Sequence, residues 1–474
     1  MSQPDISNLP NCIEDVRQGG LDQDPGPADP LQFDVLRGDL QAARSKMPPI
    51  YLDAVFNPYV ATLDQLGENK FNQILLRDPN REGEAGLMLD IAQAILQRGE
   101  GFEPKAEPAF QEVVSDLYDG FLSAEDRGGV LPPDHETLAP LVKFGNPDFG
   151  PYTWPVDATE SFGLTVGIVN LPPANARRGL FAWPALGHET GGHDILHADD
   201  GLLEQTSSAV RDALSSDAAT RALAGYWADR IDETASDVLG ILNMGPSPAI
   251  GLLGYFRGLN AAFTGSATLR NVGPDNDPHP ADIVRGFLAA ATVRQLEFSD
   301  ASAWADTIEA ETMKDVTSIQ LAGKTVDTKV AKRSAEIVSQ AIAAHPMASL
   351  ENHAFIQIQN WRDHDEDIVA QLRGVLTTAN PLPSELTTGV FAAHLVAAAT
   401  TAALTNGANI SLLFQRMLDL LKAMNDKNPS FGPLRVRHPG NMVRDRMYIP
   451  SRPQTRVATM SIAAEPRQPQ RRRA

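Results

Sequence analysis

Apolar side chains recur at the spacing of an amphipathic helix over most of this 474-residue chain. In GLMLDIAQAILQRG (86–99), Leu87, Leu89, Ile91 and Ile95 share broad apolar faces, and FQEVVSDLYDGFL (110–122) repeats the pattern. After residue 181 the same periodicity continues to about 345. A chain with so much helical periodicity can form only a fold in which helices dominate, and we expect a mainly α fold with a small β-sheet (α+β).

One segment has a clear strand pattern. FGLTVGIVNLP (162–172) alternates β-branched residues and ends at Pro172 and Pro173. Because proline cannot donate a ladder hydrogen bond, the double proline favours an edge strand over a central one.

Composition divides the chain into three parts. The first 50 residues are rich in Pro, Gly and Asp and predict an irregular arm with a short helix near Leu36–Ser45, while the similar composition of 126–160 indicates a long connection. We expect an N-terminal arm and helical region at 1–150, a catalytic region at 151–345, and a C-terminal helical region with a disordered basic tail at 346–474.

The charge balance excludes some partners. The formal charge is −20, from 40 basic and 60 acidic residues, so phosphate backbones and anionic lipids are repelled and nucleic acid is not expected as a partner. The C-terminal tail is an exception, with Arg471, Arg472 and Arg473 in succession. The single cysteine, Cys12, allows no intrachain disulfide and fits a reducing compartment.

Neither terminus nor interior predicts membrane insertion. The N-terminus lacks the basic and apolar regions of a secretory signal, and the longest apolar stretch, 386–404, is alanine-rich and interrupted by threonines and His394. We interpret that stretch as a buried helix, with His394 a satisfied core histidine, and expect a cytoplasmic protein without a membrane span.

The chemistry is concentrated first in GHETGGHD (187–194). His188 and His193 are five residues apart, so on an ideal helix the second imidazole lies about 100° beyond the favourable i+4 position. Both can bind one metal only if the helix bulges by one residue, and Gly191 and Gly192 are the residues that best tolerate such a distortion. Glu189 would then face the substrate and act as general base towards water activated by Zn²⁺.

The next residues, Asp194 and His197, follow on the same helix. We expect both to support the metal ligands from outside, although His197, four residues after His193, can also be a further ligand.

A second helical segment, DETASD (232–237), supplies the carboxylates. Glu233 and Asp237 are at i and i+4, so they share one face. Glu233 predicts the third metal ligand, and Asp237 predicts the acceptor that orients His188 or His193 through its distal N–H. Two imidazoles and one carboxylate leave the fourth position of zinc open, which is typical of catalytic rather than structural sites.

A third segment, DPHPADIVR (277–285), begins another helix. His279 can stabilise an oxyanion, as can Tyr255 or Tyr226, and Arg285 can bind a substrate or brace the site.

Together these motifs resemble those of the gluzincin zinc peptidases. HExxGH followed by ExxxD is similar to the dipeptidyl-peptidase III family, and the resemblance implies a zincin-like catalytic core with His188, His193 and Glu233 as zinc ligands and Glu189 as base. The strand around Asn170 is similar to that family's substrate-binding strand, which implies that Asn170 binds a peptide or small amide backbone. HPxxxxR resembles the CAAX-processing and heat-shock-associated metallopeptidases.

Two other interpretations stay open at this point. His193-Asp194 is a His-Asp doublet of the kind found in metal-dependent phosphohydrolases, although His135, the upstream histidine, lies in a loop-like segment. A catalytically inactive gluzincin-like binding module is the other, and retention of Glu189 argues against it.

Overall fold

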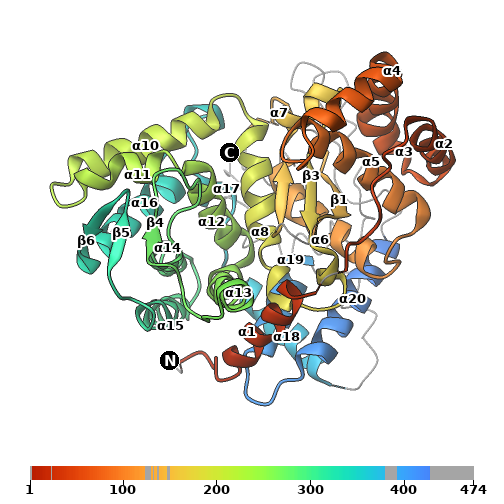
Figure 1. Cartoon of the computed structure of the whole chain (residues 1–474). Helices are drawn as coiled ribbons and strands as arrows, with labels where there is room; N and C mark the ends of the chain where they lie inside the picture. The colour runs from red at the N-terminus through yellow and green to blue at the C-terminus, as the bar shows by residue number, and fades with distance from the viewer. Residues whose placement is uncertain are drawn as a thin grey trace, which may run out of the picture.

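The computed structural model describes residues 3–22, 24–122, 130–131, 133–135, 138–146, 150–378 and 392–427. Within these ranges the chain is mainly helical with two small three-stranded sheets, which confirms the predicted fold class (Figure 1). The predicted basic tail lies outside the described residues, as does the first part of the apolar stretch 386–404.

The N-terminal part is more regular than its composition suggests. The helix near Leu36–Ser45 is present as α2, but the predicted irregular arm is wrong for 9–20, which form α1. Leu9, Cys12 and Val16 are buried on one face of α1 and pack with α13, so helical spacing prevails over the neighbouring glycines. The elements here are α1 (Leu9–Gly20), α2 (Phe33–Ala43), η1 (Arg44–Lys46), α3 (Pro49–Tyr51), η2 (Leu52–Phe56), α4 (Asn57–Arg77), α5 (Glu84–Glu100) and α6 (Ala106–Leu122).

A three-stranded sheet follows, made of β1 (Leu141–Phe144), β2 (Tyr152–Trp154) and β3 (Ile168–Leu171) in the order β1-β3-β2. β3 pairs parallel with β1 and antiparallel with β2. The prediction that this strand lies at an edge is therefore wrong. β1 and β2 are too short to give a periodic signal, and they fall in the segment interpreted as a connection.

The remaining elements are helical, apart from a second sheet, β4-β5-β6, that the sequence did not predict. The helix break expected near Gly245 is present between α12 and α13. The elements are α7 (Val156–Thr159), η3 (Glu160–Phe162), η4 (Pro173–Ala176), η5 (Leu180–Ala182), α8 (Leu186–His188), η6 (Glu189–Asp194), α9 (Ile195–Ala198), α10 (Leu202–Ser216), η7 (Arg221–Leu223), α11 (Ala224–Ala228), α12 (Ile231–Met244), α13 (Pro246–Thr264), β4 (Val272–Gly273), α14 (Asp282–Val293), α15 (Ala301–Met313), β5 (Ile319–Leu321), β6 (Lys324–Val326), α16 (Thr328–Ala344), η8 (Ala348–Leu350), α17 (Phe355–Ile358), α18 (Asp363–Thr377), α19 (Ala392–Ala403) and α20 (Ile410–Asp426).

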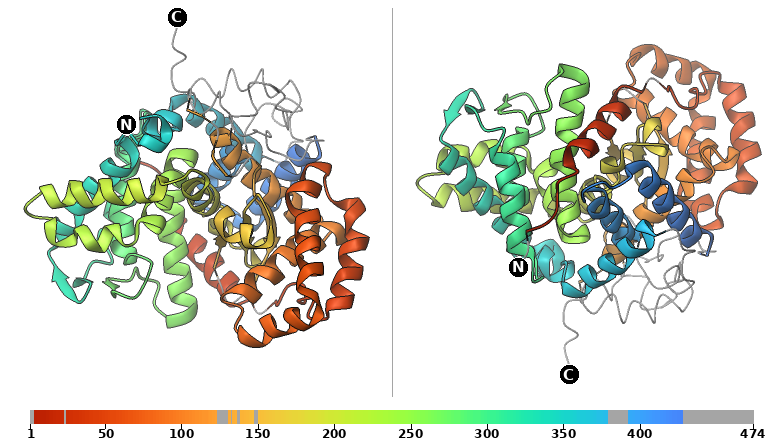
Figure 2. Two further views of the ribbon diagram at one scale, coloured as in Figure 1. Left: turned by 90° about the horizontal axis from the view of Figure 1, so that it is seen from above. Right: turned by 90° about the horizontal axis from the view of Figure 1, so that it is seen from below.

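Two apolar cores meet at the first sheet. One core joins α2–α5 to Leu141 and Ile168, and the larger one joins α1, α6 and the elements from α8 onwards to Val142 and Val169. Successive strand residues thus enter opposite cores, as the pleat requires. In the ribbon views, α2–α5 lie on one side of the molecule and α10–α16 on the other, with the sheet and η6 between them (Figure 2).

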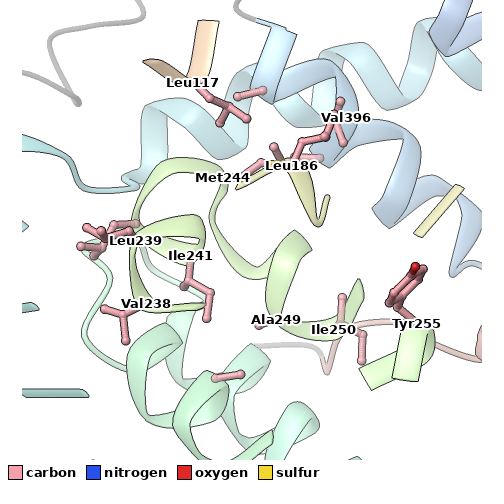
Figure 3. Close-up of a cluster of buried hydrophobic side chains, with 14 of the residues drawn as sticks. Leu117, Leu186, Val238, Leu239, Ile241, Met244, Ala249, Ile250, Tyr255 and Val396 are labelled. Carbon is pink, nitrogen blue, oxygen red and sulfur yellow. The ribbon is translucent and has the colours of Figure 1, made fainter. Parts of the chain in front are cut away.

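The larger core extends from α1 to α20, so residues on both sides of the boundaries expected at 150 and 345 pack together. α12 and the start of α13 are held inside it: Met244, at the end of α12, lies beside Leu186 of α8, Leu117 of α6 and Val396 of α19, whereas Val238 and Ile241, earlier in the helix, lie apart from these three side chains (Figure 3). All residues of α19 are buried, as predicted, and no helix in the described part of the chain has the length and apolarity needed to cross a bilayer.

Candidate metal centre

The two motif histidines lie on one helical run, α8–η6–α9, that is distorted between them. Residues Glu189–Asp194 form a π-helical turn, in which residues five apart come to the same face. The Nε2 atoms of His188 and His193 are consequently only 3.1 Å apart. The predicted one-residue bulge at the two glycines is confirmed.

Close packing explains why glycine stands in this turn. A Cβ on Gly192 would lie 2.4 Å from Ser236 Cα on α12, and one on Gly187 would lie 3.2 Å from Gly240 Cα on the same helix. The backbone of Gly192 is helical, so its role is to let α12 approach and not to allow an unusual φ. The contact brings the carboxylates of α12 to the histidines.

Glu233 closes the group from α12. Its Oε2 is 3.3 Å from His188 Nε2 and its Oε1 is 3.7 Å from His193 Nε2. Ligand atoms about 2.0–2.1 Å from a tetrahedral zinc lie roughly 3.3 Å from one another. The three atoms, which form the one group found among the described residues that could hold a metal ion, therefore have a spacing and chemistry that would suit zinc.

Each histidine has its own carboxylate behind it. His188 Nδ1 is 2.8 Å from Asp237 Oδ1, the contact predicted for Asp237, and His193 Nδ1 is 2.8 Å from Asp232 Oδ1. An Nδ1–H donated to a carboxylate leaves Nε2 as the ligating atom and fixes the ring orientation. Asp232 was not predicted for this role.

Arg285 braces the site from α14. Its Nε and Nη2 donate to the two oxygens of Asp237, each at 2.7 Å, and the side chain is almost completely buried. Arg285 also borders the pocket, and its Nη1 is 3.7 Å from Glu233 Oε2. The structure supports bracing, one of the two roles considered for Arg285, and its expected binding of substrate stays a prediction.

His279 and Tyr255 both reach the site. His279 Nε2 is 3.1 Å from Glu233 Oε1, and its side chain is about half exposed. Burial raises the pKa of Tyr255, which keeps its phenol protonated as a donor. Tyr226 is not among the residues that line the pocket, and its hydroxyl accepts a hydrogen bond from the Ala281 amide at 2.9 Å.

Glu189 lies on the wall of the pocket beside the ligands. Thr153 Oγ1 of β2 is 2.8 Å from Glu189 Oε2 and 3.2 Å from the Glu189 carbonyl, so its one proton can go to the nearer carboxylate oxygen. The pocket has a volume of about 970 Å³. Its lining includes Arg81, Asp90, Tyr152, Thr153, Trp154, Asp157, His188, Glu189, His193, His197, Asp232, Glu233, Tyr255, Phe256, His279 and Arg285.

Two predicted residues lie elsewhere. Asn170 is completely buried in the central strand, where its Nδ2 donates to the Tyr152 carbonyl at 3.2 Å, so its assignment to substrate binding is wrong. Asp194 is also fully buried, beneath the sheet, where a Cβ on Gly167 would lie 2.5 Å from its Oδ1. Asp237 and Asp232, and not Asp194, contact the Nδ1 atoms of His188 and His193, so the prediction of Asp194 as a group behind these histidines is corrected.

His197 occupies the outer position expected for it. Its Nδ1 is 3.0 Å from Asp157 Oδ2 and its Nε2 is 3.4 Å from Asp232 Oδ2. Asp232 thus joins His197 to His193, and His197 has no ligating atom in the group of three.

The electrostatics favour a cation. Burial by itself would lower the pKa of His188, but hydrogen bonds with Asp237 and Glu233 outweigh it and raise the pKa to about 10. The carboxylates that stabilise a charged imidazole would equally stabilise a metal ion in contact with it.

Comparison with known proteins adds no relative: no family model, no curated protein and no solved structure matches this chain. The resemblance to gluzincins thus depends on the motif residues and on their arrangement.

Proposed function

We propose that this chain is a zinc-dependent hydrolase, and specifically a metallopeptidase. The observation that carries the proposal is the convergence of His188, His193 and Glu233, with interatomic distances of 3.1, 3.3 and 3.7 Å, beside the carboxylate of Glu189 in one pocket. A zinc ion held by these three residues would supply a Lewis acid that polarises a carbonyl and acidifies water.

The remaining polar groups of the pocket would each have a separate role in hydrolysis. Glu189 would take a proton from the attacking water and return it to the leaving amine, while Thr153 holds one of its oxygens. Tyr255, and His279 beside Glu233, can donate to the oxygen on which negative charge develops. Asp232 and Asp237 keep both imidazoles oriented.

A peptide or small amide fits the pocket better than a phosphoester. The doublet required by the phosphohydrolase interpretation is broken, because Asp194 is buried under the sheet and does not border the pocket. Strand β2 (Tyr152–Trp154), in contrast, borders the pocket. It presents its extended backbone and the aromatic rings of Tyr152 and Trp154 to a bound substrate. Such a wall suits an extended peptide.

Substitution Glu189→Gln tests the proposal. We expect purified parent protein to contain about one zinc per chain and to cleave peptides from a mixed library, while Glu189→Gln keeps the zinc and loses roughly 10²–10⁴-fold in kcat. Glu204→Gln, on the exposed face of α10, is the matched control and should keep full activity.

Two outcomes would overturn the assignment. Cleavage of phosphoesters with two bound metals would favour the phosphohydrolase interpretation. Zinc at one per chain without any cleavage by the parent would instead leave the inactive binding module.

A further inference from the structure

Asp90 on α5 is a buried acceptor for three side chains next to the pocket. Its Oδ1 contacts the ammonium of Lys143 on β1, and its Oδ2 accepts hydrogen bonds from Tyr152 Oη and Trp154 Nε1, both at 2.8 Å. Asp90 and Lys143 are each less than one-tenth exposed. One carboxylate thus fixes both ends of β2.

β2 connects Asp90 to Glu189, the proposed general base. Tyr152 and Trp154 point to one face of the strand, so Thr153 points to the other, where its Oγ1 contacts Glu189 Oε2 at 2.8 Å and the Glu189 carbonyl at 3.2 Å. With only three residues, β2 has few ladder bonds of its own, and they join it to β3 on one side only.

The ion pair is an unusual means of holding a strand. Removing two charges from water is costly, and apolar side chains of similar size often stabilise a fold equally well. Here the contact of Lys143 with Oδ1 leaves Oδ2 of Asp90 to accept from two donors that border the pocket. The arrangement controls geometry more than it adds stability.

We propose that Asp90 is a positioning residue for Glu189, acting through β2 and Thr153. The inference depends on the proposed role of Glu189 as base. Thr153 contacts Oε2 of Glu189, so that Oε1 is left to face the attacking water. Asp90 holds β2, and with it Thr153, at the distance from Glu189 that this contact requires.

Thr153→Val removes the donor and keeps the shape of the side chain. A hydrogen bond to a charged group is worth enough that we expect kcat to fall about 10- to 100-fold, with KM and zinc content unchanged. Thr153→Ser keeps the hydroxyl and should retain most of the parent's kcat. Equal losses in the Val and Ser variants would contradict the inference, since packing alone would then explain them.

Tyr152→Phe and Tyr59→Phe form a matched pair for the role of Asp90. Both tyrosines donate to α5, but Tyr59 donates to the Met88 carbonyl at 2.6 Å and not to Asp90. We expect a lower kcat for Tyr152→Phe and an unchanged kcat for Tyr59→Phe. A Tyr59→Phe loss of the same size would show that α5 stability, and not Asp90, controls turnover.

A double-mutant cycle links the two ends of this chain of contacts. If Asp90 acts through Thr153, Asp90→Asn combined with Thr153→Val should be no slower than the slower single variant, whereas independent effects would multiply. Should Asp90→Asn fail to fold, Tyr152→Phe combined with Thr153→Val completes the same cycle.

Crystal structures separate this inference from the proposed function. The Glu189 carboxylate should be ordered against Thr153 in the parent and displaced in Thr153→Val, whether or not peptides are cleaved. An unmoved Glu189 in the variant overturns the positioning role even in an active enzyme, and an inactive parent overturns the proposed function alone.

Discussion

The metal centre and a second group beside Trp361 contain the same kinds of side chain in different geometry. In the second group, His394 Nε2 on α19 is 2.7 Å from Asp365 Oδ1 on α18, and both residues are fully buried. Trp361 lies over the imidazole, with 5.2 Å between ring centroids, and its Nε1 donates to Glu366 at 2.6 Å. Both groups are therefore buried histidine–carboxylate pairs.

The two groups differ in which imidazole nitrogen contacts the aspartate, and in whether the imidazole faces the pocket or the apolar core. At the metal centre the aspartates contact Nδ1 of His188 and His193, and the two Nε2 atoms face one another and the pocket. At His394 the carboxylate contacts Nε2 itself, inside the core. The same kinds of side chain could hold a metal ion in one place and form an internal brace in the other.

The largest expected contrast comes from removing one histidine from each group. His193→Ala deletes a ligand, so bound zinc should fall from about one per chain to near zero while the fold is kept. His394→Ala removes the imidazole that contacts the buried carboxylate of Asp365, so we expect full zinc content but a loss of roughly 1–3 kcal/mol in the free energy of unfolding. Metal analysis and denaturant titration measure the two quantities on the same samples. If His193→Ala bound as much zinc as the parent, His193 would not be a zinc ligand, and the two histidines would not differ in function.

A smaller contrast is expected from the carboxylates. Asp237→Asn weakens the orientation of His188 and should reduce zinc affinity about 10- to 100-fold. The matched change Asp365→Asn should leave zinc affinity unchanged, because Asp365 contacts His394 and the Arg362 amide. Competition with a chromogenic chelator gives both constants. An equal effect of the two substitutions would mean that zinc affinity reports only general stability.

Two helical glycines extend the comparison to the backbone. A Cβ at Gly192 would meet Ser236 on α12, whereas a Cβ at Gly374 on α18 has open space around it. Gly192→Ala should therefore cost about 1–3 kcal/mol of stability and weaken zinc binding, because α12 is pushed away from the histidines. Gly374→Ala should be neutral or stabilise by up to about 1 kcal/mol. Thermal unfolding with and without a chelator tests this, and a harmless Gly192→Ala would refute the close-packing explanation.

The sequence predicted the convergence of His188, His193 and Glu233 better than the surroundings of these residues. Two histidines five apart with glycines between them imply a bulged turn, and a carboxylate pair at i and i+4 implies a shared face; both inferences depend on local geometry that the chain itself encodes. Asn170 was assigned wrongly because the status of a strand depends on its neighbours. The three and four residues of β2 and β1 give no periodic signal.

Asp232 and Thr153 could not be assigned for a related reason. Asp232 stands in the first turn of α12, and only the crossing of α12 with η6 brings it to His193. Thr153 lies 36 residues before Glu189 and is brought to it by a sheet that the sequence did not reveal. Asp194 was misplaced because the packing of this helical run against the segment before β3, which the sequence did not predict, decides that its side chain is buried near Gly167.

The smallest expected effect concerns pH and belongs to the second group. Burial raises the pKa of Glu366 to about 7, against a hydrogen bond from Trp361 that lowers it, while the nearby Asp365 raises it further. Because the folded pKa lies above the unfolded value near 4.5, the native state binds more protons between these values, and stability falls as pH rises from about 4.5 to about 7.

Glu366→Gln keeps an acceptor for Trp361 and carries no charge at any pH. The difference in free energy of unfolding between Glu366→Gln and the parent should therefore shift in favour of the variant by about 1–2 kcal/mol between pH 5 and pH 8. Urea unfolding of both proteins at the two pH values measures this shift. A difference between the two proteins that does not change with pH would show that Glu366 is already ionised in the folded state, and hence that the group beside Trp361 is more open to water than its packing indicates.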